Sequence, residues 1–272
     1  MTNKLSIGTV TYGDRWLYFA TLHRSLRENT DLDEIDWTWH IVLNNVSPDA
    51  LSYFKRLDEE FPDKFHIYES EVNVGIGPAM DILKEEIGKG LYLFLEDDWV
   101  CLPAEYTNIS RKWLLESMEA VSSGKADMLY FRRYVDIWDA KKHFWNRKIQ
   151  EYQITPEPRD LYLSGIRFMR LIPTHWNNPH MIDLDTKYDI YPLVRNKEEG
   201  FVETKDSPGW GSTEGESSAR IQNTNIKCFY AFNGLFAHYD YLKYHYNVEG
   251  TKFVYDHPFD NNPYNYISSQ GL

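Results

Sequence analysis

Short apolar runs alternate with amphipathic stretches through the first half of the chain. Each run ends at polar or turn-forming residues, as buried strands do, and the stretches between the runs have the spacing of helices. We predict strands at 5–10, 39–43, 65–69, 91–95 and 128–131, and helices at 16–27, 48–61, 78–87 and 105–122. Alternation with short connections favours right-handed crossovers between parallel strands. The expected fold class is α/β, with a mostly parallel central sheet flanked by helices.

The regular alternation weakens after about residue 135. Between 136 and 205 only residues 161–171 predict a strand, and long irregular segments in a compact domain usually serve as functional loops. We predict a helix at 212–224 and strands at 227–232 and 235–238. No repeat, linker or low-complexity tract divides the sequence, so we expect a single domain over residues 1–272.

The fourth apolar run is followed directly by three acids, Glu96, Asp97 and Asp98. Ligands of parallel sheets gather at the carboxyl ends of the strands. Adjacent carboxylates repel one another, and a divalent cation that takes oxygen ligands from one or two of them and from a phosphate removes this repulsion. The triplet therefore predicts a metal and phosphate site. A solvated acidic turn is the alternative that this triplet alone would favour.

Composition narrows the classes of partner. The chain has 272 residues and a formal net charge of −12, which argues against a nucleic-acid or anionic-membrane surface. Aromatic residues make up 16% of the chain, and such side chains commonly line sugar and base pockets, although they more often pack in the core. Cys101 and Cys228 indicate neither a zinc site nor a disulfide framework. Without a signal segment or membrane span, a soluble cytoplasmic protein is expected.

Polar residues follow the other strands as well. Because the carboxyl ends of parallel strands share one edge, we expect these residues to converge with the acids. They are Thr9, Thr11, Tyr12 and Gly13 after the first strand, Asn44 and Asn45 after the second, and Asn73, Gly75 and Gly77 after the third. Glycines before a helix allow an anion to approach free N–H groups, although a plain turn has the same composition. The sequence has neither the dinucleotide-binding GxGxxG opening nor a P-loop.

These segments resemble the nucleotide-diphosphosugar glycosyltransferases of the GT-A, Rossmann-like fold, above all the family-2-like inverting enzymes. Residues 7–12 are similar to the first strand, whose following loop holds the nucleobase. Residues 41–49 are similar to the second strand and its turn, with Asn44 where the family usually has an acid that receives the uracil N–H. Residues 73–81 are similar to a helix start, with Asp81 in place of the last Asn.

The acid triplet resembles the DxD-type motif of that family, in its EDD form. The resemblance implies that Asp98 binds Mn²⁺ or Mg²⁺ directly, that Asp97 lies near the donor ribose or sugar, and that Glu96 supports the site. Residues 236–239 resemble the closing strand, which implies that His238 completes the metal shell. A structural role for His238 is equally open, and His245 and His257 compete with it for the metal.

Residues 209–220 resemble the GWG signature of the family, in which an acid after the turn is the catalytic base. The resemblance implies that Trp210 contacts the donor, that Glu214 is the base, that Glu216 is the second acid and that Arg220 is the helix arginine. Thr213 replaces the first acid of the signature, which leaves Glu216 as an alternative base. An exposed acidic helix start is the structural alternative.

The resemblance implies a metal-dependent inverting glycosyltransferase that moves a sugar from a nucleotide-diphosphate donor, most simply a UDP-sugar such as UDP-xylose, to a hydroxyl of a glycan acceptor. Residues 5–135 would bind the donor, 136–250 would hold the acceptor and the base, with Trp176, Asn177 and Asn178 shaping the acceptor pocket, and 251–272 would form a tail. Two alternatives remain open, a metal-dependent nucleotidyltransferase or phosphohydrolase and a non-enzymatic glycan-binding module. No nucleic acid and no membrane span are expected.

Overall fold

The computed structural model describes residues 4–102, 110–132, 159–170, 179–189, 191, 221, 224–231 and 235–238. Its helices are α1 (Trp16–Asn29), α2 (Pro48–Glu60), α3 (Ile76–Ile87), α5 (Trp113–Ser122) and α7 (Leu184–Lys187), with a 3-10 turn at Leu32–Glu34. Its strands are β1 (Lys4–Gly13), β2 (Asp36–Val46), β3 (Phe65–Ser70), β4 (Leu91–Phe94), β5 (Trp99–Cys101), β6 (Met128–Tyr130), β7 (Leu161–Leu163), β8 (Ile166–Arg170), β9 (His180–Asp183), β10 (Cys228–Ala231) and β11 (Phe236–His238).

One nine-stranded sheet organises the described residues, in the order β3-β2-β1-β4-β9-β6-β10-β8-β7. Strands β3, β2, β1 and β4 are parallel neighbours, and only β8 and β9 run against the direction of the others. A separate antiparallel pair joins β5 to β11. The predicted α/β class with a mostly parallel sheet is confirmed.

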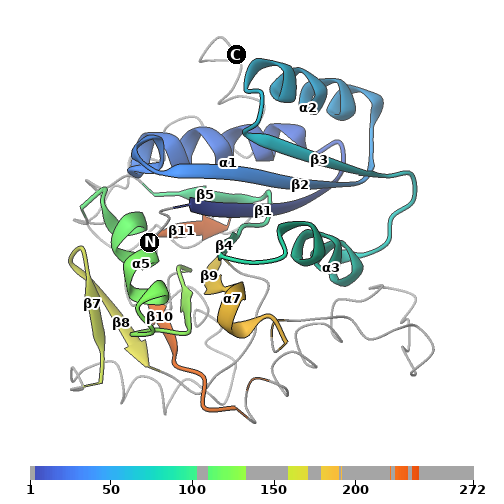
Figure 1. Cartoon of the computed structure of the whole chain (residues 1–272). Coiled ribbons are helices and arrows are strands. Elements are labelled where there is room, and N and C mark those ends of the chain that lie inside the picture. Colours follow the sequence, from blue (N-terminus) through green and yellow to red (C-terminus); the bar gives the residue numbers. More distant parts are fainter. Residues whose placement is uncertain are drawn as a thin grey trace, which may run out of the picture.

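Helices cover both faces of this sheet. In Figure 1, α1 and α2 lie on one side of β1 and β2, and α3 lies on the other. Alternate residues of each strand face the two sides, so Ile41 packs in the core beneath α1 and α2 while Val42 packs beneath α3. Trp113 and Leu114 of α5 join the core on the α1 side. The central strands are therefore shielded on both faces, which leaves their ends as the places where polar side chains reach solvent.

Local sequence signals set the boundaries of helices α2 and α3. Ser47 is the N-cap of α2, because its hydroxyl accepts the Ala50 N–H at 3.1 Å and Pro48 occupies the first turn. Gly75 precedes α3 with a φ of 84°, and Gly88 ends it with a φ of 70°. Few other residues adopt such angles without strain, so both glycines are required by the backbone.

Several sequence expectations need correction, and strand β5 is one element that was not predicted. The single strand predicted at 161–171 is a hairpin of β7 and β8, because Ser164 and Gly165 both have positive φ and turn the chain back. Strand β9 was not predicted, although it pairs with β4 and β6 at the centre of the sheet. Strands β1 and β2 continue to Gly13 and Val46, so residues expected after these strands lie within them.

We expect Gly8→Ala to destabilise the protein by about 1–3 kcal/mol, the usual cost of overpacking a core. A Cβ at Gly8 would lie 2.6 Å from Cε2 of Tyr92, whose ring is fully buried and packs against Phe94 and Tyr191. Urea unfolding of Gly8→Ala, Tyr92→Leu and the double variant measures the effect. Because the smaller side chain gives room to the new methyl group, the double variant should lose less than the sum of the single losses. Strict additivity would contradict this packing.

We also expect stability to fall below pH 6.5, because burial and the positive charge of Arg27 lower the pKa of His23 from its ordinary 6.5 to about 4. The folded state takes up its proton less readily than the unfolded chain, so the stabilisation is complete above pH 6.5 and is lost as the pH falls to 4. His23 accounts for up to roughly 3 kcal/mol of this loss. Urea unfolding at pH 7 and pH 4.5 should show a smaller loss for His23→Phe than for the native chain. Equal losses would exclude His23 as the source.

Candidate active site

The carboxyl ends of β1, β2 and β4 lie side by side at one edge of the sheet. β1 pairs in parallel with β2 on one side and with β4 on the other. The Leu95 N–H donates to the Gly8 carbonyl at 2.9 Å, which extends the pairing of β4 with β1 to the residue before the acids. Glu96, Asp97 and Asp98 therefore leave the sheet beside the last residues of β1, as the strand pattern predicts.

Asp97 and Asp98 share one cation, the guanidinium of Arg15. Arg15 Nη2 lies 2.8 Å from Asp97 Oδ1 and 2.5 Å from Asp98 Oδ2. The Asp97 side chain is 2% exposed, that of Asp98 16% and that of Arg15 22%. The guanidinium carbon also lies 4.9 Å from the ring centroid of Tyr12 and 5.2 Å from that of Tyr18, within the range of cation–π attraction. We call Arg15, Asp97 and Asp98 the acid–arginine cluster.

Burial controls the electrostatics of this cluster. It raises the pKa of Asp97, as does the neighbouring Asp98, and together they outweigh the lowering by Arg15 and by the Thr11 hydroxyl. The Thr11 hydroxyl lowers the pKa of Asp97, although the two side chains do not form a well-aligned hydrogen bond. Burial also works to lower the pKa of Arg15, but the two carboxylates raise it above its ordinary value. Burial and the neighbouring carboxylate therefore disfavour the negative charge of Asp97 unless a cation balances it.

The pair of carboxylates fits a Mg²⁺ or Mn²⁺ ion that also binds a phosphate. Asp97 Oδ2 is buried and has no hydrogen-bond partner in the described part of the chain, so one oxygen of the pair lacks the contact that buried carboxylates normally have. Such ions commonly take one or two protein carboxylates and complete their shell with water and phosphate oxygens. Among the described residues, no three His, Cys, Asp or Glu side chains gather at one point. The remaining ligands would have to come from elsewhere.

The segment after the acids is held against the closing strand. Trp99 Nε1 donates to Glu96 Oε2 at 3.1 Å, so Glu96 fixes the turn between β4 and β5. In the β5–β11 pair His238 is opposite Trp99, the residue that follows Asp98 in the chain. The backbone register thus places His238 beside the residue that follows Asp98, and its role in a metal shell stays a prediction.

Asn44 connects β2 to the loop that precedes α3. Its Nδ2 donates to Asn73 Oδ1 at 2.9 Å, and its Oδ1 accepts the Val74 N–H at 2.8 Å. Asn73 Oδ1 also accepts the Gly75 N–H at 2.9 Å, so that N–H already has a partner. An amide oxygen has two lone pairs, which leaves one on Asn44 for a further donor. Asn44 therefore shapes the loop whatever its role toward a nucleobase.

The three predicted side chains at the end of β1 differ in exposure. Thr9 and Thr11 are fully buried, and Thr9 Oγ1 accepts the indole N–H of Trp39 at 2.9 Å. Tyr12 is 49% exposed and lies beside Arg15. Of these three side chains, Tyr12 alone reaches solvent, while Thr9 and Thr11 pack inside the strand end.

Several predicted residues lie outside the described part of the chain. They are Trp210, Glu214, Glu216 and Arg220 of the GWG segment and Trp176, Asn177 and Asn178 of the expected acceptor region. Their roles stay predictions. Arg15, in contrast, was missed by the sequence reasoning. Arg15 lies between a strand end and a helix start, and this position indicates a contact with the acids only once β1 and β4 are known to be neighbours.

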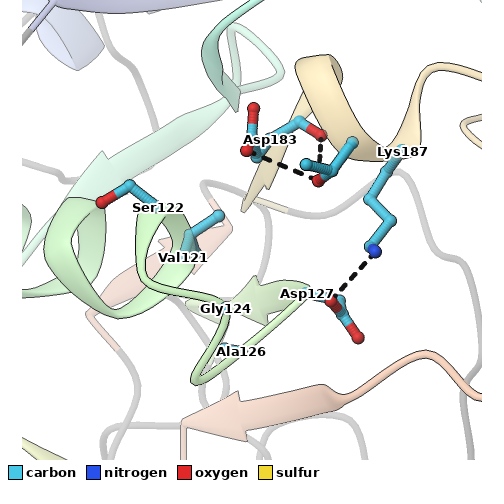
Figure 2. Close-up of a pocket in the computed structure, with 8 residues that line it drawn as sticks. Val121, Ser122, Gly124, Ala126, Asp127, Asp183 and Lys187 are labelled. Atoms are coloured by element: carbon cyan, nitrogen blue, oxygen red, sulfur yellow. Dashed lines mark hydrogen bonds and ion pairs between the residues drawn. The ribbon is translucent and has the colours of Figure 1, made fainter. Parts of the chain in front are cut away.

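Two hollows in the described structure do not contain the acids. Figure 2 shows one of about 110 Å³ between α5 and α7, where Lys187 pairs with Asp127 at 3.1 Å. Small-ligand pockets usually measure roughly 300–1,000 Å³, so this one is too small for a nucleotide sugar. A groove of about 930 Å³ lies between α1 and α2 and includes Trp16, Tyr53 and Phe61. Neither is lined by a residue of the acid–arginine cluster.

The described residues contain no helix with both the length and the apolar composition needed to cross a bilayer.

No protein-family model matches the sequence, and no curated protein sequence matches it. Solved structures are similar to it. GalNAc-T7 with UDP, GalNAc and Mn²⁺ has a TM-score of 0.58 and 10% identity, and the match covers 86% of this chain and 43% of that chain. The mannosyltransferase PcManGT from Pyrobaculum calidifontis, in complex with GDP-Man and Mn²⁺, has a TM-score of 0.53 and 11% identity over 82% of this chain and 53% of that chain.

The structure of TarS from S. aureus is also similar, with a TM-score of 0.53 and 14% identity. The match covers 84% of this chain and 35% of that chain. The chain therefore spans about half or less of the length of these three proteins. At such low identities the likeness concerns the fold, and the fold is that of the GT-A nucleotide-sugar glycosyltransferases, as the sequence resemblance predicts.

Proposed function

We propose that this chain is a metal-dependent inverting glycosyltransferase that transfers a sugar from a nucleoside-diphosphate donor to a hydroxyl of a glycan acceptor. One observation carries the proposal. In a GT-A fold, the acids Asp97 and Asp98 stand directly after β4, beside the end of the central strand β1. This is the edge at which sheets of this kind bind ligands.

Asp98 is proposed as the direct protein ligand of the cation and Asp97 as a neighbour of the donor ribose or sugar. Asp98 is the more exposed of the two, so it is the better placed to meet an ion that arrives with the donor. When bound, Mn²⁺ or Mg²⁺ supplies positive charge that stabilises the leaving diphosphate. Glu96 keeps the turn in place through Trp99, and His238 is the proposed further ligand because its strand pairs beside Asp98.

The donor nucleoside is proposed to lie over the ends of β1 and β2. Tyr12 offers an exposed ring there, and rings of this kind stack on bases. The loop fixed by Asn44, with Asn73 and Gly75, forms the neighbouring wall. The second lone pair of the Asn44 oxygen is proposed to accept the imide N–H of uracil or the N1–H of guanine, from a side chain that is 3% exposed. We propose a UDP-sugar as the donor, with UDP-xylose as one candidate.

Glu214 is proposed as the base that removes the proton from the acceptor hydroxyl. The hydroxyl oxygen then attacks the anomeric carbon on the face opposite to the diphosphate, the bond to the diphosphate breaks, and the configuration inverts. Trp210 in the same segment is proposed to contact the donor sugar. These two assignments rest on the resemblance of residues 209–220 to the GWG signature.

A panel of nucleotide sugars tests the proposal. The protein is incubated with each donor and Mn²⁺, with and without a set of glycan acceptors, and the released nucleoside diphosphate and the glycosylated product are measured. Release that depends on an acceptor and yields a product supports a transferase. Release without any product favours a phosphohydrolase, and glycan binding that persists in EDTA without turnover favours a binding module.

A further inference from the structure

The acid–arginine cluster holds its own cation. A single nitrogen, Nη2 of Arg15, reaches one oxygen of Asp97 and one oxygen of Asp98 at 2.8 and 2.5 Å. It therefore stands between the two carboxylates, and its positive charge opposes a divalent ion that would bind the same pair. The contact is well enclosed, because the Asp97 side chain is only 2% exposed and the rings of Tyr12 and Tyr18 flank the guanidinium.

We propose that Arg15 is a built-in competitor of the divalent cation. In the donor-free protein it pairs with both Asp97 and Asp98, and a divalent ion binds there tightly only when Arg15 releases at least one of them. The metal alone should therefore bind weakly. This inference deepens the proposed function, because it says when the metal site forms.

The released guanidinium needs a new anion, and a diphosphate is well suited to supply it. Arginine binds phosphate oxygens through paired N–H donors, and charge-assisted hydrogen bonds of this kind are about twice as strong as neutral ones. Arg15 directly precedes α1, and its side chain is partly exposed. The side chain can therefore turn toward a ligand without moving the sheet. A donor diphosphate would then bring the cation and at the same time accept hydrogen bonds from the Arg15 guanidinium.

Such an exchange makes metal and diphosphate binding mutually dependent. If the diphosphate draws Arg15 away from the acids, it raises the affinity for the metal, and by linkage the metal raises the affinity for the diphosphate by the same factor. Removing the guanidinium should uncouple them. The metal alone would bind more tightly, and the nucleotide would add less to its affinity.

Mn²⁺ binding, followed by electron paramagnetic resonance without any nucleotide, tests the proposal. We expect Arg15→Gln to bind Mn²⁺ about tenfold more tightly than the native chain, or more, because the buried Asp97 and the partly buried Asp98 lose their counter-ion. Arg24→Gln is the matched control, since Arg24 is on α1 but pairs with Glu28 at 2.7 Å, and it should leave the Mn²⁺ affinity unchanged. Adding Asp98→Asn to Arg15→Gln should abolish the gain, which locates the ion at this cluster.

Unchanged or weaker Mn²⁺ binding by Arg15→Gln would overturn the inference. The same titrations in the presence of UDP or GDP distinguish a failure of this inference from a failure of the proposed function. Nucleotide-dependent Mn²⁺ binding with no effect of Arg15→Gln would reject the competition and leave the transferase standing. A gain in Mn²⁺ affinity without any nucleotide binding would support the competition and reject the transferase.

A second variant covers the case in which Arg15→Gln does not fold without metal. Arg15→Lys keeps the charge but lacks the planar guanidinium, so it should hold the acid pair less firmly and bind Mn²⁺ more tightly than the native chain. Its melting temperature should also rise more on addition of Mn²⁺ alone than that of the native chain. A lysine variant that matches the native chain in both measurements would contradict the proposal.

Discussion

Asp98→Asn is expected to abolish Mn²⁺-dependent binding of the nucleoside diphosphate and, with it, sugar transfer. The change removes the charge of the carboxylate that we assign to the metal, at a point where the neighbouring Asp97 is more deeply buried. Changes to residues that only support metal ligands typically weaken binding by about 10–100-fold, and loss of a direct ligand should cost at least as much. Calorimetric titration with UDP and Mn²⁺ measures the loss.

The fold should survive this change, because Asp97 still pairs with Arg15 and the core around β4 is untouched. Asp58→Asn is the control, since Asp58 is an exposed acid on α2, away from the acid–arginine cluster. Native affinity for the nucleotide and metal in Asp98→Asn would remove Asp98 from the proposed metal site.

Glu214→Gln is expected to lower the rate of transfer by about 10²- to 10⁴-fold, the usual contribution of a general base. The amide keeps the size of the side chain but does not take a proton from the acceptor hydroxyl. Binding of the nucleotide with Mn²⁺ should remain, because the donor is held at the edge of β1, β2 and β4. Product formation and calorimetric binding, measured on the same preparation, separate the two effects.

Glu216→Gln is the matched variant for this test, since it removes the other acid of the same segment. If Glu216→Gln abolishes transfer while Glu214→Gln turns over at a near-native rate, the base is Glu216. If neither variant slows transfer, the resemblance of residues 209–220 to the GWG signature does not identify the base.

The local pattern was sufficient to predict the first half of the sheet. Apolar runs and helix signals such as Ser47 and Gly88 are encoded within a few residues of each element, and the structure confirms them. The approach of the acids to the end of β1 also followed from the pattern, since carboxyl ends of parallel strands share an edge. Strand β9 could not be found in this way, because it is short and is stabilised by pairing with strands distant in the sequence.

The sequence predicted which acids lie in the candidate site, but it did not predict the contacts that its side chains make. Asn44 was expected to face a nucleobase, and the structure shows its amide bonded to Asn73 and Val74, partners that only folding brings near. The role of Arg15 was not predictable from the sequence, because this residue belongs to no motif. Its position becomes meaningful only when β1 and β4 are known to be neighbours. Sequence patterns identify which groups reach an edge, whereas the pairing of strands decides which groups meet.

The most direct test of the central claim is the melting temperature of the native chain with UDP, GDP, CMP and dTDP, each in Mn²⁺ and again in EDTA. Binding to the folded state raises the melting temperature, by an amount that grows with ligand concentration relative to the dissociation constant. We predict a clear rise with one nucleoside diphosphate, UDP in the first instance, that disappears in EDTA. No rise with any of the four in Mn²⁺ would contradict a metal-dependent nucleotide-sugar site at Asp97 and Asp98.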